Sequence, residues 1–323
     1  MSGQTPHRPH LLGPDFVPIL EGEGRGNVTR FAPSPTGYLH LGHAYAVLFA
    51  YEAARLTGGR FLLRLEDIDS QRCLPEFAQA SIDDLRWLGL RWDGGVVRQS
   101  ARSEHYRTAL DHLRQIDLLY PCFCSRKQIR MEIEEAGRAP HGPAGETIYP
   151  GICRHLDPLE ARYRMDRGEA FAWRLDVAKA HVSAGDLWWY DVRAGWIQAA
   201  PERLGDVVLA RKDVPSSYHL AVTIDDAAQG VTLVTRGEDL FEATHIHCLL
   251  QAVLGLAQPR YYHHNLISDR NGQRLAKRNA AQTIRYFRDN RRSPDDVWRQ
   301  IGMAPPSLAA APAGLPGRSC ALR

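Results

Sequence analysis

VTRFAPSPTGYLHLGHA, residues 28–44, is the stretch of sequence that decides the fold. Its first five residues are a short run typical of a buried strand, and a turn rich in proline, serine and glycine follows at 33–37. Apolar residues then recur at helical spacing over 42–56, and FLLRL at 61–65 is a second strand. A strand, a helix and a strand within about 40 residues predict a βαβ unit, and therefore a parallel sheet of Rossmann type.

The segment between residues 121 and 200 differs in character from the sequence on either side. It holds cysteines, a stretch rich in glycine and proline, and a β-like run at 171–177, which together indicate an insertion between two halves of the sheet. Before it, amphipathic helices are predicted at 75–88 and at 103–119, the second with Ser103 as its N-cap. After it we predict short buried strands at 206–210, 220–224 and 231–234, and a helix at 243–256.

The composition bounds the class of protein. A chain of 323 residues with 44% hydrophobic and 24% charged residues has enough apolar material for a soluble globular fold. Its start lacks a signal sequence and no window approaches the roughly 20 apolar residues of a membrane span, so we expect a cytoplasmic protein without a membrane partner. The net charge of +3 is small, so any RNA-binding surface must be a local patch.

Two histidines stand at the predicted start of the first helix. His40 and His43 are three residues apart, and Gly37 and Gly42 allow the backbone to approach a ligand closely. Because the N-terminus of a helix attracts anions, this arrangement suits a polyphosphate.

Several segments together resemble the glutamyl-tRNA synthetases and their relatives. RFAPSPTG at 30–37 followed by HLGH at 40–43 resembles their opening, including the HIGH signature of class I enzymes. RLEDID at 64–69 resembles their RLEDTD segment, and RLAKR at 274–278 stands in the place of the KMSKS loop. The segments that line the amino-acid pocket in the family are matched by YHLA at 218–221 and TRGEDL at 235–240.

The resemblance implies ATP-dependent activation of glutamate. A carboxylate after a parallel strand can receive the substrate ammonium, and the planar fork of an arginine fits a carboxylate. The implied glutamate site is Arg30, Ser34, Glu66, Tyr218 and Arg236. The implied ATP site is Pro33, His40, Gly42, His43, Leu275 and Lys277, with Mg²⁺ on the phosphates. The implied catalytic residues are His40, His43 and Lys277.

The basic loop departs from the family pattern at two positions. Arg274 and Ala276 stand where the family has a lysine and a serine, whereas Lys277 is retained. The family's cations at this loop stabilise the phosphates of ATP as pyrophosphate leaves. Lowered activity is compatible with this departure, and loss of activity is not implied.

Three of the six cysteines form a cluster in the sequence, Cys122-x-Cys124 and, further on, Cys153. Soft thiolates in this arrangement suit a structural zinc ion, which needs a fourth ligand. Cys-x-Cys followed by Tyr-x-x-x-Cys resembles the zinc site of the glutamyl-Q tRNA(Asp) synthetases, in which a tyrosine is the fourth ligand. The resemblance therefore implies Tyr149, with His155 and His141 as alternatives.

The extent of the resemblance bears on the acceptor. It covers roughly residues 28–285, and the chain ends about 40 residues later, where discriminating glutamyl-tRNA synthetases continue into an anticodon-binding domain. The truncated family with this zinc pattern attaches glutamate to queuosine in the anticodon of tRNA(Asp). We therefore expect a monomer that binds glutamate, ATP and tRNA(Asp) carrying queuosine. Two alternatives are a truncated glutamyl-tRNA synthetase that charges tRNA(Glu) and, because of Ala276, a catalytically silent RNA-binding paralogue.

These expectations combine into one domain organisation: an α/β fold of the class I synthetase type, with a Rossmann-type parallel sheet, a zinc-containing insertion and a short helical C-terminal part. The predicted parts are an N-terminal extension at 1–27, the first half of the Rossmann domain at 28–120, the zinc-binding or acceptor-type insertion at 121–200, the second half of the Rossmann domain at 201–265, the KMSKS-like loop and helical end at 266–303, and a disordered tail at 304–323.

Overall fold

The computed structural model describes residues 26–125, 127–129, 148–211, 214–267 and 283–306. Nearly all of the predicted N-terminal extension, most of the predicted tail and the basic loop around Lys277 lie outside these residues. Within them, the predicted βαβ unit is confirmed, since its two strands pair in parallel with Arg30 opposite Leu62. Its elements are β1 at Val28–Phe31, α2 at Leu41–Arg55 and β2 at Arg60–Leu65.

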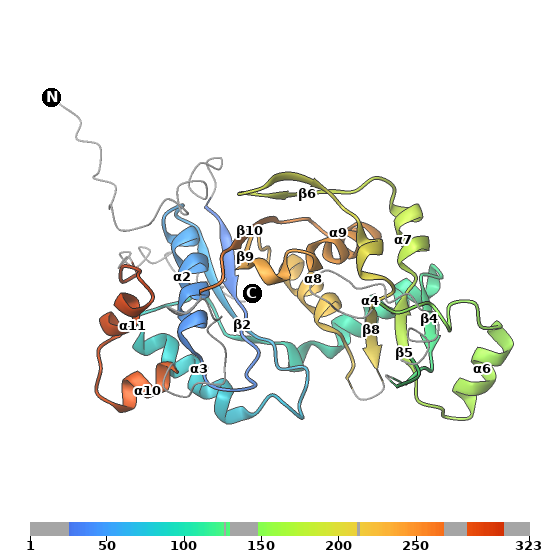
Figure 1. Cartoon of the computed structure of the whole chain (residues 1–323), viewed down its shortest axis with the longest axis horizontal. Helices are drawn as coiled ribbons and strands as arrows, with labels where there is room; N and C mark the ends of the chain where they lie inside the picture. Colours follow the sequence, from blue (N-terminus) through green and yellow to red (C-terminus); the bar gives the residue numbers. More distant parts are fainter. Residues whose placement is uncertain (1–25, 126, 130–147, 212–213, 268–282, 307–323) are drawn as a thin grey trace, which may run out of the picture.

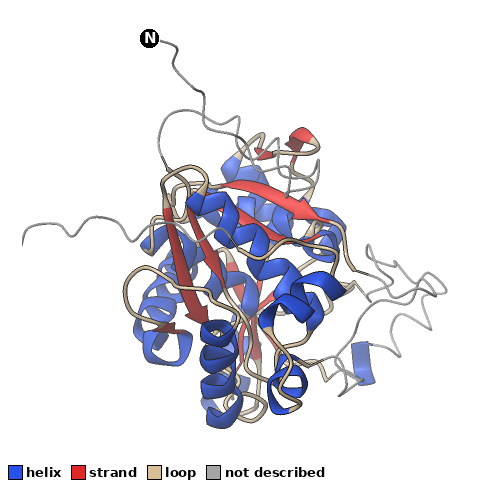
Figure 2. Cartoon of the chain, turned by 90° about the vertical axis from the view of Figure 1, so that its left-hand side faces the viewer, coloured by secondary structure: helices blue, strands red, loops and turns tan. Residues whose placement is uncertain are grey.

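The central sheet consists of two sets of strands that meet along β1. A short strand, β3 at Val97–Arg98, continues the first set in parallel beside β2. The second set meets β1 where the Thr232 backbone N–H donates to the Val28 carbonyl over 2.9 Å. Figure 2 shows the strands of this centre with helices packed around them. The second set consists of β7 at Gly195–Gln198, β6 at Trp188–Asp191, β10 at Arg260–His264 and β9 at Leu233–Gly237, in that order.

Helices build two main cores, the first with strands of the central sheet and the second with a smaller antiparallel sheet. The first core lies under α2 and includes Leu48, Phe61 and Trp298, and the second includes Leu113, Leu209 and Leu249. Figure 1 shows the helices of the chain's end beside α2 and α3. The helices are α3 at Pro75–Trp87, α4 at Ser103–Gln115, α8 at Tyr218–Ala228, α9 at Ala243–Val253, α10 at Ile284–Asp289 and α11 at Pro294–Gln300.

A smaller antiparallel sheet lies on the other side of the molecule (Figure 1). Its strands are β4 at Leu119–Cys122, β5 at Ala172–Leu175 and β8 at Val208–Arg211, and the helices α6 at Pro158–Asp166 and α7 at Val177–Ala184 belong to the same part of the chain. Strand β4 spans the predicted first limit of the insertion at residue 121. Two pairings cross the second limit at residue 200, since β8 pairs with β5 and β6 joins the central sheet through β10. The division into domains stays a prediction.

Two local predictions are wrong. The run at 220–224, predicted as a buried strand, lies in helix α8, because the Ser217 hydroxyl accepts the Leu220 backbone N–H and starts a helix there. Ser103 is not an N-cap, since a 3₁₀ turn at Gln99–Arg102 precedes it and Arg102 holds the cap position. A short apolar run fits a buried helix as well as a strand, and periodicity alone does not separate them.

Among the residues that the structure describes, no helix is long and apolar enough to cross a bilayer.

Candidate active site

The two histidines of the HLGH motif cap helix α2. The His40 ring accepts the Gly42 backbone N–H at Nδ1 over 3.1 Å, and the His43 ring accepts the His40 backbone N–H at Nδ1 over 3.1 Å. The two rings lie 3.9 Å apart between centroids. Because both Nδ1 atoms are acceptors, the proton of each neutral ring sits on Nε2. The helix N-terminus therefore carries two imidazole N–H donors beside its backbone N–H groups.

The far end of the chain returns to this helix start. Thr283 forms an isolated antiparallel bridge with His40, and the Ile284 backbone N–H donates to the Leu39 carbonyl over 2.8 Å. Arg285 donates to the Tyr38 hydroxyl over 2.6 Å. Lys277 and Leu275 lie outside the described residues. Thr283, six positions after Lys277, lies next to His40.

Arg30 lies in a buried network of opposite charges. Its Nε donates to Asp226 over 2.9 Å, and its Nη1 donates to the Thr235 carbonyl over 3.3 Å. Arg64 donates to the same Asp226 oxygen over 2.8 Å, and this pairing together with the Arg30 pairing holds the pKa of Asp226 below its usual value, against the effect of burial. Arg30 is therefore already paired with a carboxylate.

Glu66 and Tyr218 line one pocket together with Ser34. The pocket measures about 450 Å³. Glu66 follows strand β2, where its backbone N–H donates to the Pro33 carbonyl over 3.0 Å. Burial raises the pKa of the Glu66 carboxyl, although Arg64 and Arg30 act against this. A carboxylate thus lies at the carboxyl ends of parallel strands, where open α/β sheets bind their ligands.

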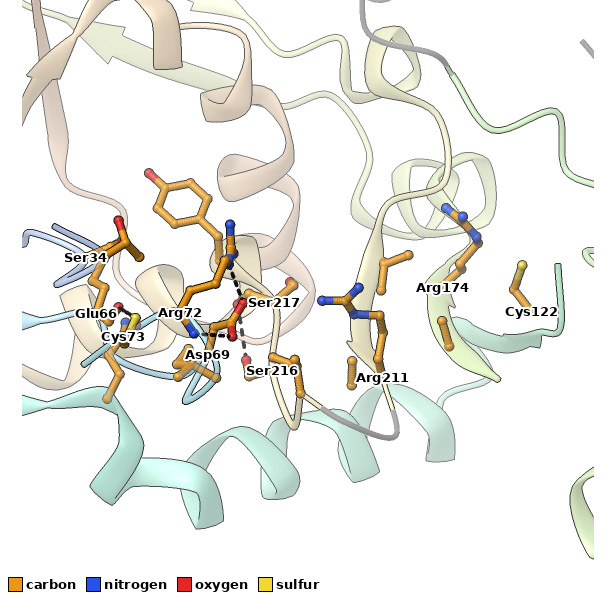
Figure 3. Close-up of a pocket in the computed structure, with 18 of the residues that line it drawn as sticks. Ser34, Glu66, Asp69, Arg72, Cys73, Cys122, Arg174, Arg211, Ser216 and Ser217 are labelled. Carbon is orange, nitrogen blue, oxygen red and sulfur yellow. Dashed lines mark hydrogen bonds and ion pairs between the residues drawn. The ribbon is translucent and has the colours of Figure 1, made fainter. Parts of the chain in front are cut away.

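The pocket extends from these residues to the small antiparallel sheet. Figure 3 shows Ser34 and Glu66 on one side and Arg174 and Cys122 on the other, with Arg211 between them. Three of the predicted glutamate residues (Ser34, Glu66 and Tyr218) and two of the predicted zinc ligands (Cys122 and Cys124) thus line one cavity, although they lie far apart in the sequence.

Arg236 has a different environment from Arg30. It is buried, with a relative exposure of 6%, and its hydrogen-bond partners among the described residues are neutral. Within the described residues it forms no ion pair with a carboxylate. Its donors reach His263 Nε2 over 3.1 Å, Tyr218 Oη over 3.3 Å, His247 Nδ1 over 3.2 Å and Thr244 Oγ1 over 2.6 Å. The structure therefore places Arg236 against Tyr218, which lines the pocket, with no carboxylate bonded to the guanidinium among the described residues.

The sequence interpretation missed the residues that surround Arg236. His263 is far from Arg236 in the sequence, and His247 lies on the next helix, α9. Asp191, which contacts His263 Nδ1 over 2.7 Å, lies in the segment predicted as insertion. The sequence did offer a signal for this cluster, namely four histidines among apolar residues: His245, His247, His263 and His264. Burial lowers the pKa of His263 to about 4, with Arg236 acting in the same direction and Asp191 against it.

The three predicted cysteine ligands come together. Their sulfur atoms lie within 4.8 Å of one another, and Cys124 Sγ and Cys153 Sγ are 3.4 Å apart. The Tyr149 hydroxyl lies 3.4 Å from Cys122 Sγ and 3.6 Å from Cys124 Sγ. Ligands about 2.3 Å from a tetrahedral zinc ion are about 3.8 Å apart, so these four side chains fit one. His155 is exposed and outside this group, and His141 lies outside the described residues.

Comparisons with known proteins identify the family of the chain. Residues 27–304 match the family described as "tRNA synthetases class I (E and Q), catalytic domain". The chain is 50% identical over 288 residues to the glutamyl-Q tRNA(Asp) synthetase of Rhodobacter capsulatus, covering 85% of this chain and 100% of the relative. It is 42% identical over 272 residues to the glutamyl-Q tRNA(Asp) synthetase of Nocardia farcinica, covering 84% of this chain and 82% of the relative.

A solved structure of a glutamate tRNA ligase from Elizabethkingia meningosepticum, in complex with its amino acid, superposes with a TM-score of 0.66. The identity is 29%, and the match covers 79% of this chain and 52% of that ligase, so the chain spans about half of the ligase's length. The family match over most of the chain and the identity to these relatives lead to one conclusion. The chain belongs to the class I tRNA synthetases (E and Q), among the glutamyl-Q tRNA(Asp) synthetases.

Proposed function

We propose that the protein activates glutamate with ATP and transfers it to queuosine in the anticodon of tRNA(Asp). The observation that carries the first half is Arg236, a buried guanidinium whose partners among the described residues are neutral and include Tyr218, which lines the pocket that holds Glu66. A buried cation without a counter-charge is costly for the free protein. A substrate carboxylate supplies the missing charge.

The glutamate site assigned here uses three kinds of contact. Arg236 binds the side-chain carboxylate, and Glu66 receives the ammonium group at the carboxyl end of β2. Ser34 and Tyr218 line the pocket and orient the substrate. Arg30, whose charge is shared with Asp226, contributes hydrogen bonds to the α-carboxylate rather than net charge.

The phosphates of ATP are assigned to the start of α2. His40 and His43 donate through Nε2 to phosphate oxygens, while Pro33 and Gly42 form the adjoining backbone. Leu275 and Lys277 are assigned to the same site by the family pattern, and Thr283 beside His40 supports this. Mg²⁺ bound to ATP neutralises the phosphate charge.

The reaction needs positioning and electrostatic stabilisation more than acid–base chemistry. An oxygen of the glutamate α-carboxylate attacks the α-phosphorus of ATP. The bond between this phosphorus and the oxygen that bridges it to the β-phosphorus breaks, and pyrophosphate leaves. A hydroxyl of the queuosine cyclopentenediol then attacks the carbonyl carbon of glutamyl-adenylate. AMP leaves, and the proton of the attacking hydroxyl is released.

The choice of acceptor is supported by the relative from Rhodobacter capsulatus, whose whole length aligns at 50% identity and whose name specifies glutamyl-Q tRNA(Asp). Arg174 and Arg211 line the pocket on the side of the small sheet, and their positive charge suits the phosphates of an approaching tRNA. A cytoplasmic location and a monomeric state stay predictions.

A structural zinc ion is proposed at Cys122, Cys124, Tyr149 and Cys153. The mutual distances of their ligand atoms support it, as does Arg174, whose guanidinium carbon lies 3.8 Å from the Tyr149 ring centroid. The ion would tie the end of β4 to the segment that precedes α6. It would hold one wall of the pocket without taking part in the reaction.

Charging of tRNA(Glu) is the second candidate, favoured by the superposition with a glutamate tRNA ligase. The test is transfer of radiolabelled glutamate to three acceptors: tRNA(Asp) with queuosine, tRNA(Asp) without it, and tRNA(Glu). We expect labelling of the first alone, and periodate treatment of the queuosine diol abolishes it. Labelling of tRNA(Glu) alone would refute our choice, and absence of glutamate-dependent ATP–pyrophosphate exchange would indicate a silent paralogue.

The zinc proposal has its own test. Elemental analysis of the purified protein is expected to find about one zinc per chain, and Cys122→Ser is expected to lose it. Cys248→Ser is the matched control, because Cys248 is a buried free cysteine outside the group. A wild-type protein without zinc, or equal zinc in both variants, contradicts the site.

A further inference from the structure

Three neighbouring strands of the central sheet place an acid, a histidine and an arginine in a row. Asp191 ends β6, His263 lies in β10, and Arg236 lies in β9 directly opposite His263 in the parallel register. Asp191 Oδ2 lies 2.7 Å from His263 Nδ1, and His263 Nε2 lies 3.1 Å from Arg236 Nε. All three side chains are buried, with relative exposures of 1%, 3% and 6%.

The direction of these hydrogen bonds follows from chemistry. A guanidinium only donates, so His263 Nε2 accepts and carries no proton. The ring proton is therefore on Nδ1, where it is donated to Asp191. The contacts of Thr244 are consistent with this tautomer. Its hydroxyl accepts from Arg236 Nη2 and lies 3.3 Å from His263 Nε2, to which it can donate.

The carboxylate of Asp191 is fully used by this arrangement. Its Oδ1 accepts the backbone N–H groups of Arg193 and Ala194 over 2.9 and 3.0 Å, and its Oδ2 accepts the His263 backbone N–H over 3.2 Å besides the ring. Its charge is thus satisfied by the turn that follows β6 and by His263. A neutral imidazole separates it from Arg236.

We infer that Asp191 and His263 are positioning residues of the glutamate site, which orient the Arg236 guanidinium while leaving its charge for the substrate. This inference rests on the proposed function, since it presumes that Arg236 binds the glutamate side chain. A carboxylate in direct contact, such as the one that Arg30 has, would orient the guanidinium but also neutralise it.

A specificity follows from this arrangement. An oriented guanidinium with uncompensated charge favours a carboxylate over a carboxamide, because glutamine brings no negative charge and presents an amide NH₂ to a group that only donates. Removal of the His263 acceptor frees the guanidinium to rotate. Affinity for glutamate then falls, and so does the preference for glutamate over glutamine.

The test compares substitutions of two similarly buried histidines. His263→Leu removes the acceptor, and His263→Gln restores an acceptor oxygen near the Nε2 position. His245→Leu is the matched control, because His245 contacts Trp189 and the Ala200 backbone rather than Arg236. The measurements are the KM and kcat for glutamate and glutamine in ATP–pyrophosphate exchange, together with the Tm of each variant.

We expect His263→Leu to raise the KM for glutamate about tenfold with little change in kcat, the loss of one hydrogen bond to a charged group. His263→Gln should recover most of this, and Asp191→Asn should resemble His263→Leu. The ratio of kcat/KM for glutamate to kcat/KM for glutamine should fall to a similar extent. A KM and a ratio equal to those of His245→Leu at a similar Tm would overturn the inference.

A second measurement needs no variant and keeps the inference testable if a variant fails to fold. Two-bond ¹H–¹⁵N correlation spectra of the wild-type protein report the tautomer of His263, and we expect the proton on Nδ1. A proton on Nε2 would overturn the inference. The proposed function and the inferred role both fail if wild type shows this tautomer but neither glutamate-dependent exchange nor glutamate binding by calorimetry. The inference alone fails if wild type exchanges normally and the variants match the control.

Discussion

Two buried arginines lie near Tyr218, which lines the pocket, and their surroundings differ. Arg30 shares Asp226 with Arg64, and Glu66 adds a second carboxylate to that network. Arg236 has a tyrosine, a threonine and two histidines around it, all neutral. A buried arginine that is paired with a carboxylate has its charge balanced within the protein. A buried arginine without such a partner favours the binding of a substrate carboxylate. The difference separates the charge-neutral hydrogen bonding proposed for Arg30 from the charge recognition proposed for Arg236.

The largest effect is expected from unbalancing the first region. Asp226→Asn leaves Arg30 and Arg64 buried with weaker partners, so the free energy of unfolding should fall by about 3–5 kcal/mol. Urea denaturation followed by circular dichroism measures it. A fall of less than about 1 kcal/mol would show that this network is not held by its charges.

The neutrality of the histidines around Arg236 predicts a dependence on acid. Burial lowers the pKa of His263 to about 4, below the 6.5 of the unfolded chain. Unfolding therefore takes up a proton between these values, and stability is lost as the pH falls from about 6.5 towards 4. His263 alone should account for about 2 kcal/mol between pH 7 and pH 5.

The difference between two proteins isolates this contribution. Wild type should lose about 2 kcal/mol more stability than His263→Leu when both are taken from pH 7 to pH 5. Glu66, whose pKa is raised by burial, acts in the opposite direction but is present in both and cancels. Equal losses in the two proteins would mean that His263 is already charged.

Removal of the uncompensated charge itself should cost less than removal of Asp226. Arg236→Met gives up hydrogen bonds to His263 and His247 but also relieves the desolvation of an unpaired guanidinium. The free protein should lose about 1–2 kcal/mol of stability in urea denaturation. A loss as large as that of Asp226→Asn would indicate that Arg236 is balanced by a charge after all.

The smallest effect is expected at an exposed ion pair that serves as a reference for both regions. Arg114 and Asp111 lie three residues apart on α4, and both side chains are half exposed. Asp111→Asn should change stability by less than about 0.5 kcal/mol. A larger change would mean that the denaturation measurements overstate charge effects in general.

The part of the fold carried by local sequence was predictable. The βαβ unit follows from apolar spacing, and its strands, helix and parallel pairing are as predicted. The run at 220–224 was mistaken for a strand because four apolar residues and a threonine fit either element, although Ser217 offered a capping signal. The sheet membership of β6 and β8 depends on pairing across long sequence separations, which no local pattern encodes.

The same limit applies to the site. Family motifs identified Arg236 and Tyr218, and the structure places them 3.3 Å apart between Nη1 and Oη. Asp191 carries no motif, and it meets His263 across 72 positions of sequence. Nor does the sequence reveal that Arg30 is neutralised by Asp226 whereas Arg236 is not, because charge balance is a property of the folded neighbourhood.

The most direct measurement is calorimetric titration of wild type and Arg236→Met with glutamate and with glutamine. We predict that wild type binds glutamate at least about 100-fold more tightly than glutamine, and that Arg236→Met loses this preference together with about 3 kcal/mol of glutamate affinity. Arg30 and Asp226 remain intact in the variant. Retention of the glutamate preference by Arg236→Met would contradict the account, since the charge that selects the substrate would then lie elsewhere.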